Sequence, residues 1–420
     1  MKIHLEDLIN YLVLIVVILF ILLSPNISSV LQVSGILCII INLYLAFRCR
    51  NNKLLLLLFS LIAFTNLSLS YTDAINLGKG VSLWQSNGLR KDVINNIVMK
   101  SILLNTTVLN TLLSRNLLNK ISKQTFLDRK KNSLISISGI IILYLILIYG
   151  FASIKSSIGN YVSVDSPIYE YSLIIYCLVW FYSKDMKLID YLIYLYSFVF
   201  FSYFLIIGDR SSVFMLAIIF LILYLYDYIK LKFISLFVLI GIPIVNIFGV
   251  LRSSGLLNLN NIIHLTLEKG FYVDTVSWAY YTSLALAKLH YRVEQPFEIA
   301  IGFFSGVLGF KNEFYFLGSY AKDNFSDLYN AGGGIYPSYF FAMGGYTGVI
   351  LGAVLLFFII KYIMSFNNIE FLPYKILLVT FAFRWYVYSP ATLLRGVLIL
   401  SSFAIIACYL FDKLTKRKNE

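Results

Sequence analysis

Long runs of apolar residues alternate with short polar segments along most of the chain. A helix needs about 20 mainly apolar residues to cross the hydrocarbon core of a bilayer, so runs close to this length predict transmembrane helices. Such runs lie at 8–24, 30–47, 54–71, 93–113, 133–154, 168–183, 188–207, 211–226, 233–251, 336–362, 374–389 and 395–411. The pattern therefore predicts an all-α polytopic membrane protein of about 12 transmembrane helices, forming a single integral membrane domain over residues 1–420.

The run at 93–113 is the most polar of the twelve. At 100° per residue one helical face carries its polar side chains, which are Asn96, Lys100, Thr107, Asn110 and Thr111. Such a helix can cross the bilayer with this face toward the protein interior, or it can lie flat in the membrane interface.

Composition and charge support a membrane protein and favour one orientation. Hydrophobic residues make up 59% of the chain and charged residues 13%, which is too apolar for a soluble domain of this length. If 93–113 spans, the basic clusters at 48–53, 114–131 and 413–418 fall on one side, which the positive-inside rule makes cytoplasmic. Both termini are then cytoplasmic, and the net charge of +13 is explained without nucleic-acid binding.

The longest connection, 252–335, then lies outside the cytoplasm between the ninth and tenth spans. Its segment VDTVSWAYYTSLALAKLHY has the apolar spacing of a helix. The later stretch FEIAIGFFSGVLGF has 14 residues, which suits an interfacial or re-entrant segment better than a span. Because ordered loops of this length usually carry function, we expect part of the functional site here.

In this topology five arginines lie at or near the outer face. They are Arg210 in GDRSS, Arg252 in VLRSSG, Arg292, Arg384 and Arg395. Single arginines near helix ends often extend to the interface without further function. Five at one level, on the side where basic residues are disfavoured, indicate binding of phosphate or carboxylate, which guanidinium groups hold bidentately. Asp209 either pairs with Arg210 or acts as a base.

Two further features are candidates for chemistry. His290 lies in KLHYRVEQPFE and is either a solvated histidine or an acid–base group. The segment GGGIYPS at 332–338 ends the long connection, and Gly333, Gly334 and Ser338 are candidate substrate-binding residues because N–H groups at a helix N-terminus can hold an anion. Gly344, Gly348 and Gly352 repeat every four residues, which predicts close helix packing.

The sequence offers no signature of a metal or cofactor site. No spacing of His, Cys, Asp or Glu residues matches a metal-binding motif, and no acidic D-x-D is present. We therefore expect chemistry without a metal ion or cofactor.

At this point the chain resembles the O-antigen polymerases of the Wzy type. Three features carry the resemblance: GDRSS opening a span, a large outer connection that begins with an arginine, and a G-G-G-x-x-P-S segment leading into a glycine-rich helix with arginines near the last two spans. The related O-antigen ligases carry a histidine just before the helix that follows their large loop. Here Ile335, Tyr336 and Ser338 occupy that neighbourhood, so the resemblance assigns no catalytic base.

The resemblance implies a GT-C-like glycosyltransferase in the bacterial inner membrane. It would act at the periplasmic face and transfer the growing glycan from one undecaprenyl-diphosphate-linked oligosaccharide to the next, with a chain-length regulator as a further potential partner. Preorganised arginines in a dry site would stabilise the leaving diphosphate. The alternative is a flippase for the same lipid-linked oligosaccharide, although a transporter of this size favours two comparable halves and short outer loops.

Overall fold

The computed structural model describes residues 4–77, 92–122, 127–150, 168–207, 210–234, 273–292, 296–325, 333–366 and 368–417. The described secondary structure is helical, apart from one isolated antiparallel bridge between Lys131 and Ser183. This confirms an all-α protein. The chain divides into two compact units, each assembled from three separate stretches of sequence.

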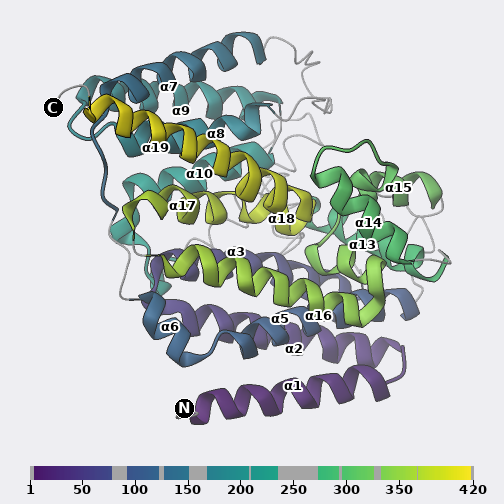
Figure 1. Cartoon of the computed structure of the whole chain (residues 1–420). Coiled ribbons are helices and arrows are strands. Elements are labelled where there is room, and N and C mark those ends of the chain that lie inside the picture. The colour runs from purple at the N-terminus through teal and green to yellow at the C-terminus, as the bar shows by residue number, and fades with distance from the viewer. Residues whose placement is uncertain are drawn as a thin grey trace, which may run out of the picture. The chain divides into compact units, whose positions relative to one another are not determined.

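Unit 1 comprises residues 1–124, 230–365 and 382–391. Its long helices run side by side, and α13, α14 and α15 gather beside the start of α16 (Figure 1). Its elements are α1 (Leu5–Leu23), α2 (Ser28–Arg48), η1 (Cys49–Asn51), α3 (Lys53–Leu69), η2 (Ser70–Ile75), α5 (Asp92–Leu112), α6 (Arg115–Ser122), α13 (Asp274–Arg292), α14 (Pro296–Val307), η5 (Glu313–Phe316), α15 (Leu317–Asn324), α16 (Tyr336–Ser365) and α18 (Ala382–Val387).

Unit 2 comprises residues 125–229, 366–381 and 392–420. In it α8 packs against α7 and α17, and α10 packs against α9 and α17. Its elements are α7 (Ser133–Leu145), η3 (Ile146–Gly150), α8 (Ile168–Tyr182), α9 (Lys187–Ile207), α10 (Arg210–Tyr224), η4 (Tyr226–Tyr228), η6 (Ile369–Phe371), α17 (Leu372–Thr380), η7 (Thr392–Leu400) and α19 (Ser401–Arg417).

Asparagine side chains begin several of these helices. The Oδ1 atom of Asn52 accepts the N–H of Leu55 at 2.9 Å, and Asn132 caps α7 in the same way through Ile135 at 3.2 Å. Each cap satisfies an N–H group that the first turn of a helix cannot pair internally. The helices α14 and α17 instead have proline in their first turn, where its missing N–H is tolerated.

Six of the described helices are long and apolar enough to cross a membrane, and α5 with the bent α6 makes a seventh if the pair is one span. The protein is therefore a multi-pass helical membrane protein. Helices coincide with eleven of the twelve predicted runs, but 168–183 and 211–226 form helices of only 15 residues each. The run 374–389 is split at Phe381 into α17 and α18, and most of 233–251 lies outside the described residues.

The polar helix α5 is enclosed within unit 1 by α1, α2, α13 and α16. Its predicted polar face is buried, as are Asn95, Ser101, Asn105 and Thr106 on its other faces. The ammonium group of Lys100 donates to the carbonyl of Ser24 at 2.9 Å and to Asn26 Oδ1 at 3.1 Å. The polar face predicted for 93–113 therefore lies toward the interior of unit 1.

Candidate functional site

The helix α16 is broken at Gly344 and Gly345. Gly344 has φ −169° and ψ 26°, and Gly345 has φ 59° and ψ −145°, so neither continues the helix. The hydroxyl of Tyr336 donates to the carbonyl of Gly352 at 2.9 Å. Residues 16 apart would lie about 24 Å apart along an uninterrupted helix, so 336–343 must fold back against the part that follows the break.

Two of the three regularly spaced glycines allow this close packing. A Cβ atom on Gly348 would lie 2.1 Å from the carbonyl oxygen of Phe340, and one on Gly352 would lie 2.5 Å from the Phe340 ring. The repeat therefore does serve helix contact, but the contact is with the preceding segment of α16 itself. Gly344 contributes to the break and not to the packed face.

The imidazole of His290 lies on this break. Its Nδ1 atom is 3.4 Å from the carbonyl oxygen of Ala342, near the end of the folded-back segment. A Cβ atom on Gly345 would lie 3.1 Å from Nε2 of the same ring. If Nδ1 carries the proton and donates to Ala342, Nε2 holds the lone pair and can accept a proton from a substrate hydroxyl.

The folded-back segment runs alongside α13, which explains why His290 reaches the break. The N–H of Ile335 donates to Ser283 Oγ at 2.9 Å, and seven residues further along both segments Ala342 meets His290. Aromatic rings surround the imidazole: those of Tyr291 and Phe341 lie 5.2 and 5.1 Å away between centroids. His290 is half-buried and Tyr291 is exposed.

Two cations near the end of α13, Lys288 and Arg292, lie over the ring of Phe325. The guanidinium of Arg292 lies 4.6 Å from the centroid of the Phe325 ring, and the ammonium of Lys288 lies 5.8 Å from the same centroid. Arg292 is exposed. Because side chains two positions apart on a helix do not face each other, the imidazole of His290 and these two cations lie on different faces of α13.

Arg384 and the glycines before α16 meet at Tyr388. The carbonyl of Tyr388 accepts the N–H of Gly334 at 3.0 Å and the hydroxyl of Tyr339 at 2.5 Å. Gly333 lies against the Tyr388 ring, where a Cβ atom would come within 2.7 Å of it. The guanidinium of Arg384 lies 4.3 Å from the centroid of that ring.

Three N–H groups at the start of α16 already have acceptors in the protein. Gly334 donates to Tyr388, Ile335 to Ser283, and Ser338 to the carbonyl of Ile335 at 2.9 Å. Pro337 has no N–H group to offer. These three N–H groups therefore donate within the protein, and the substrate-binding roles of Gly333, Gly334 and Ser338 stay predictions. Ser338 itself is buried.

The remaining predicted residues belong to unit 2 or lie outside the described residues. Arg210 begins α10 and Arg395 lies in η7, and both belong to unit 2. Nothing is described for the side chain of Arg210, and Asp209 and Arg252 lie outside the described residues. Their roles stay predictions. Among the described residues, no group of three or more His, Cys, Asp or Glu side chains could hold a metal ion.

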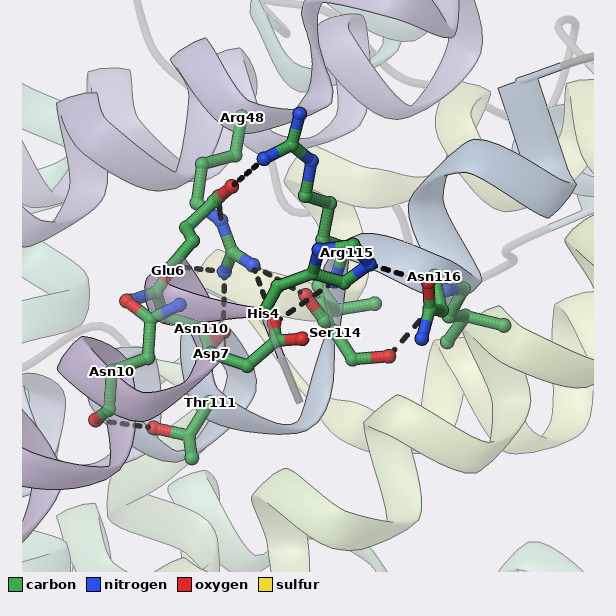
Figure 2. Close-up of polar contacts among 12 residues, drawn as sticks. His4, Glu6, Asp7, Asn10, Arg48, Asn110, Thr111, Ser114, Arg115 and Asn116 are labelled. Atoms are coloured by element: carbon green, nitrogen blue, oxygen red, sulfur yellow. Dashed lines mark hydrogen bonds and ion pairs between the residues drawn. The ribbon is translucent and has the colours of Figure 1, made fainter. Parts of the chain in front are cut away.

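The sequence patterns gave no indication of a buried charge cluster at the end of α2 (Figure 2). The guanidinium of Arg48 pairs with Glu6 Oε1 at 2.6 Å and lies 3.7 Å from Asp7 Oδ1. It also donates to the carbonyl and side-chain oxygens of Asn110 at 2.5 and 2.7 Å and to the carbonyl of Leu113 at 2.8 Å. The charge pattern places Arg48 in a cytoplasmic basic cluster, whereas in the structure its charge attaches α1 and α5 to α2.

Comparison of the chain with protein-family models, with curated proteins and with solved structures finds no match. Functional inference therefore rests on the residues at the break in α16.

Proposed function

We propose that this protein polymerises undecaprenyl-diphosphate-linked oligosaccharide repeat units by glycosyl transfer at the periplasmic face of the bacterial inner membrane. The proposal assumes twelve spans in a GT-C-like arrangement, with both termini cytoplasmic and 252–335 on the periplasmic side. The proposal is supported by the multi-pass helical architecture, by sequence motifs that resemble those of polymerases of the Wzy type, and by the chemistry available at the break in α16.

The observation that carries the proposal is the contact of His290, on α13, with the break in α16, a candidate membrane span. Non-helical backbone within membrane segments is tolerated where it is buried in protein or lines a cavity, and broken helices commonly border binding sites. An imidazole there can take a proton, and the guanidinium of Arg292 at the end of the same helix, α13, can hold a phosphate. These are the two functions that transfer from a lipid diphosphate requires.

The reaction can be written with these groups. A hydroxyl oxygen of the acceptor sugar forms a bond to the anomeric carbon of the donor glycan, while the bond from that carbon to the diphosphate oxygen breaks. The hydroxyl proton passes to Nε2 of His290, and the lipid diphosphate leaves with the bonding electrons. Arg292 stabilises the negative charge that develops on the diphosphate, with Arg210, Arg252, Arg384 and Arg395 as further candidates. The exposed ring of Tyr291 offers a surface on which a sugar can stack.

The test uses purified protein in liposomes with lipid-linked repeat units isolated from the host membrane. Conversion of single units into a ladder of longer lipid-linked glycans on a gel would support the proposal. If the glycans stay at one repeat unit but become accessible to a glycosidase on the opposite side of the vesicle, the protein is a flippase. If neither the length nor the sidedness of the glycans changes, the proposal fails, provided that the protein is shown to be folded.

A further inference from the structure

The helix α14 exposes an apolar face along its whole length. Phe297, Ile301, Phe304 and Leu308 are spaced by four, three and four residues, which places them on one side of a helix. Phe297 is 73% exposed, Ile301 56% and Leu308 69%. Phe310 and Phe316, in the segment that follows, are also exposed. A soluble surface rarely keeps so many large apolar side chains together, so this face indicates a binding partner.

The opposite side of α14 is firmly packed, so the exposed face has a fixed direction. Ile299, Phe303 and Val307 are buried. The two glycines of the helix permit close approach of the segment that follows: a Cβ atom on Gly302 would lie 2.6 Å from the Phe314 ring, and one on Gly306 would lie 2.4 Å from Cβ of Tyr315. The helix is therefore apolar on both sides, and one of these sides packs inside unit 1.

Lipid is the partner that fits this face. With 12 residues α14 is about 18 Å long, which is too short to cross a bilayer of about 30 Å. It packs against α16, a candidate span whose exposed residues Leu351, Phe358 and Tyr362 require lipid around them. The contact includes Phe303 of α14 and Tyr339 at the start of α16, whose ring centroids lie 6.1 Å apart. Exposed phenylalanine rings at this density suit the region between headgroups and acyl chains.

We propose that α14 is an interfacial helix whose Phe297, Ile301, Phe304 and Leu308 side chains contact the acyl chains of the bilayer. Only residues 293–295 separate it from the end of α13, which carries His290 and Arg292. Contact of α14 with the bilayer would therefore fix the depth of His290 and Arg292 in the membrane, close to the level of the lipid phosphates. This inference does not depend on the proposed reaction.

The test places a fluorescent probe on the helix in a variant whose four native cysteines have been replaced. Ile301→Cys is labelled with an environment-sensitive nitrobenzoxadiazole dye and reconstituted into phosphatidylcholine vesicles with brominated acyl chains. Asp323→Cys is the matched control, because Asp323 is exposed on α15 in the same unit. We expect the lipid bromines to quench the probe at Ile301 several-fold more strongly than the probe at Asp323. Aqueous iodide should show the reverse preference.

Two outcomes would overturn the proposal. Iodide quenching at Ile301 as strong as at Asp323 would show that water covers the face. Protection of Ile301 from both quenchers would show that protein covers it, through a second copy or another partner. Phe297→Cys, at the other end of the same face, repeats the measurement if Ile301→Cys melts at a lower temperature than the unlabelled protein.

Discussion

Replacing Gly345 with alanine tests the geometry of the break in α16. Its φ of 59° with ψ of −145° belongs to a backbone region that is essentially confined to glycine, so alanine should cost about 1–3 kcal/mol in strain. The new Cβ would also lie 3.1 Å from Nε2 of His290 and push the imidazole away from Ala342. Weakening that hydrogen bond adds about 0.5–1.5 kcal/mol.

Two other glycines separate these contributions. Gly309 has φ 102°, and a Cβ atom there would have no neighbour within 4 Å, so Gly309→Ala should show backbone strain alone. Gly344 has an extended φ of −169° and only an ordinary contact with Thr347 at 3.8 Å, so Gly344→Ala should cost little. We expect destabilisation to rise in the order Gly344→Ala, Gly309→Ala, Gly345→Ala, with about 2–4 kcal/mol for the last.

The assay is equilibrium unfolding of purified protein in mixed micelles, followed by tryptophan fluorescence. A double-mutant cycle with His290→Ala isolates the contact, because alanine at 345 then meets no imidazole. We expect a coupling free energy of at least about 0.5 kcal/mol, above the usual error of additivity. A cost for Gly345→Ala no greater than for Gly344→Ala would refute the left-handed geometry. Strict additivity with His290→Ala would refute the contact.

Four further predictions concern the reaction and the fold. His290→Gln should lower the rate of polymer formation by about 10²–10⁴-fold in the liposome assay while the protein stays folded, and an unchanged rate would exclude it as the base. Arg210→Lys and Arg252→Lys keep the charge but lose the bidentate fork, so each should reduce long-chain product at normal protein levels; full activity in both would assign them to the interface only. Polymerisation should persist in excess EDTA, and inhibition that Mn²⁺ reverses would show a required metal. Arg48→Leu should destabilise the protein by about 3–5 kcal/mol, because it leaves buried acidic and carbonyl groups unpaired. The control Arg50→Leu, at an exposed position, should change the free energy of unfolding by less than about 0.5 kcal/mol. Equal costs for the two variants would contradict the buried cluster.

The sequence by itself determined the class of the protein and the position of most helices. Long apolar runs can be satisfied only by helices in lipid, because every backbone polar group there needs an internal partner. The helical spacing of VDTVSWAYYTSLALAKLHY corresponds to α13, and the polar face of 93–113 to a buried face of α5. The paired Gly344 and Gly345 were a local signal for the break, but their four-residue spacing with Gly348 and Gly352 equally suited a continuous helix.

Only the tertiary structure decided which distant residues meet. Periodicity reports which side of a helix is apolar, but it does not report which neighbour covers that side. The folding-back of α16 brings Ala342 and Gly345 to His290, more than 50 residues earlier, because small residues let the two segments touch. In the same way, the sequence presents Arg48 as one of several cytoplasmic basic residues, whereas the structure shows it bonded to Glu6 and Asn110. Local sequence patterns do not encode this long-range packing, so they could not show that the charge of Arg48 is buried and structural.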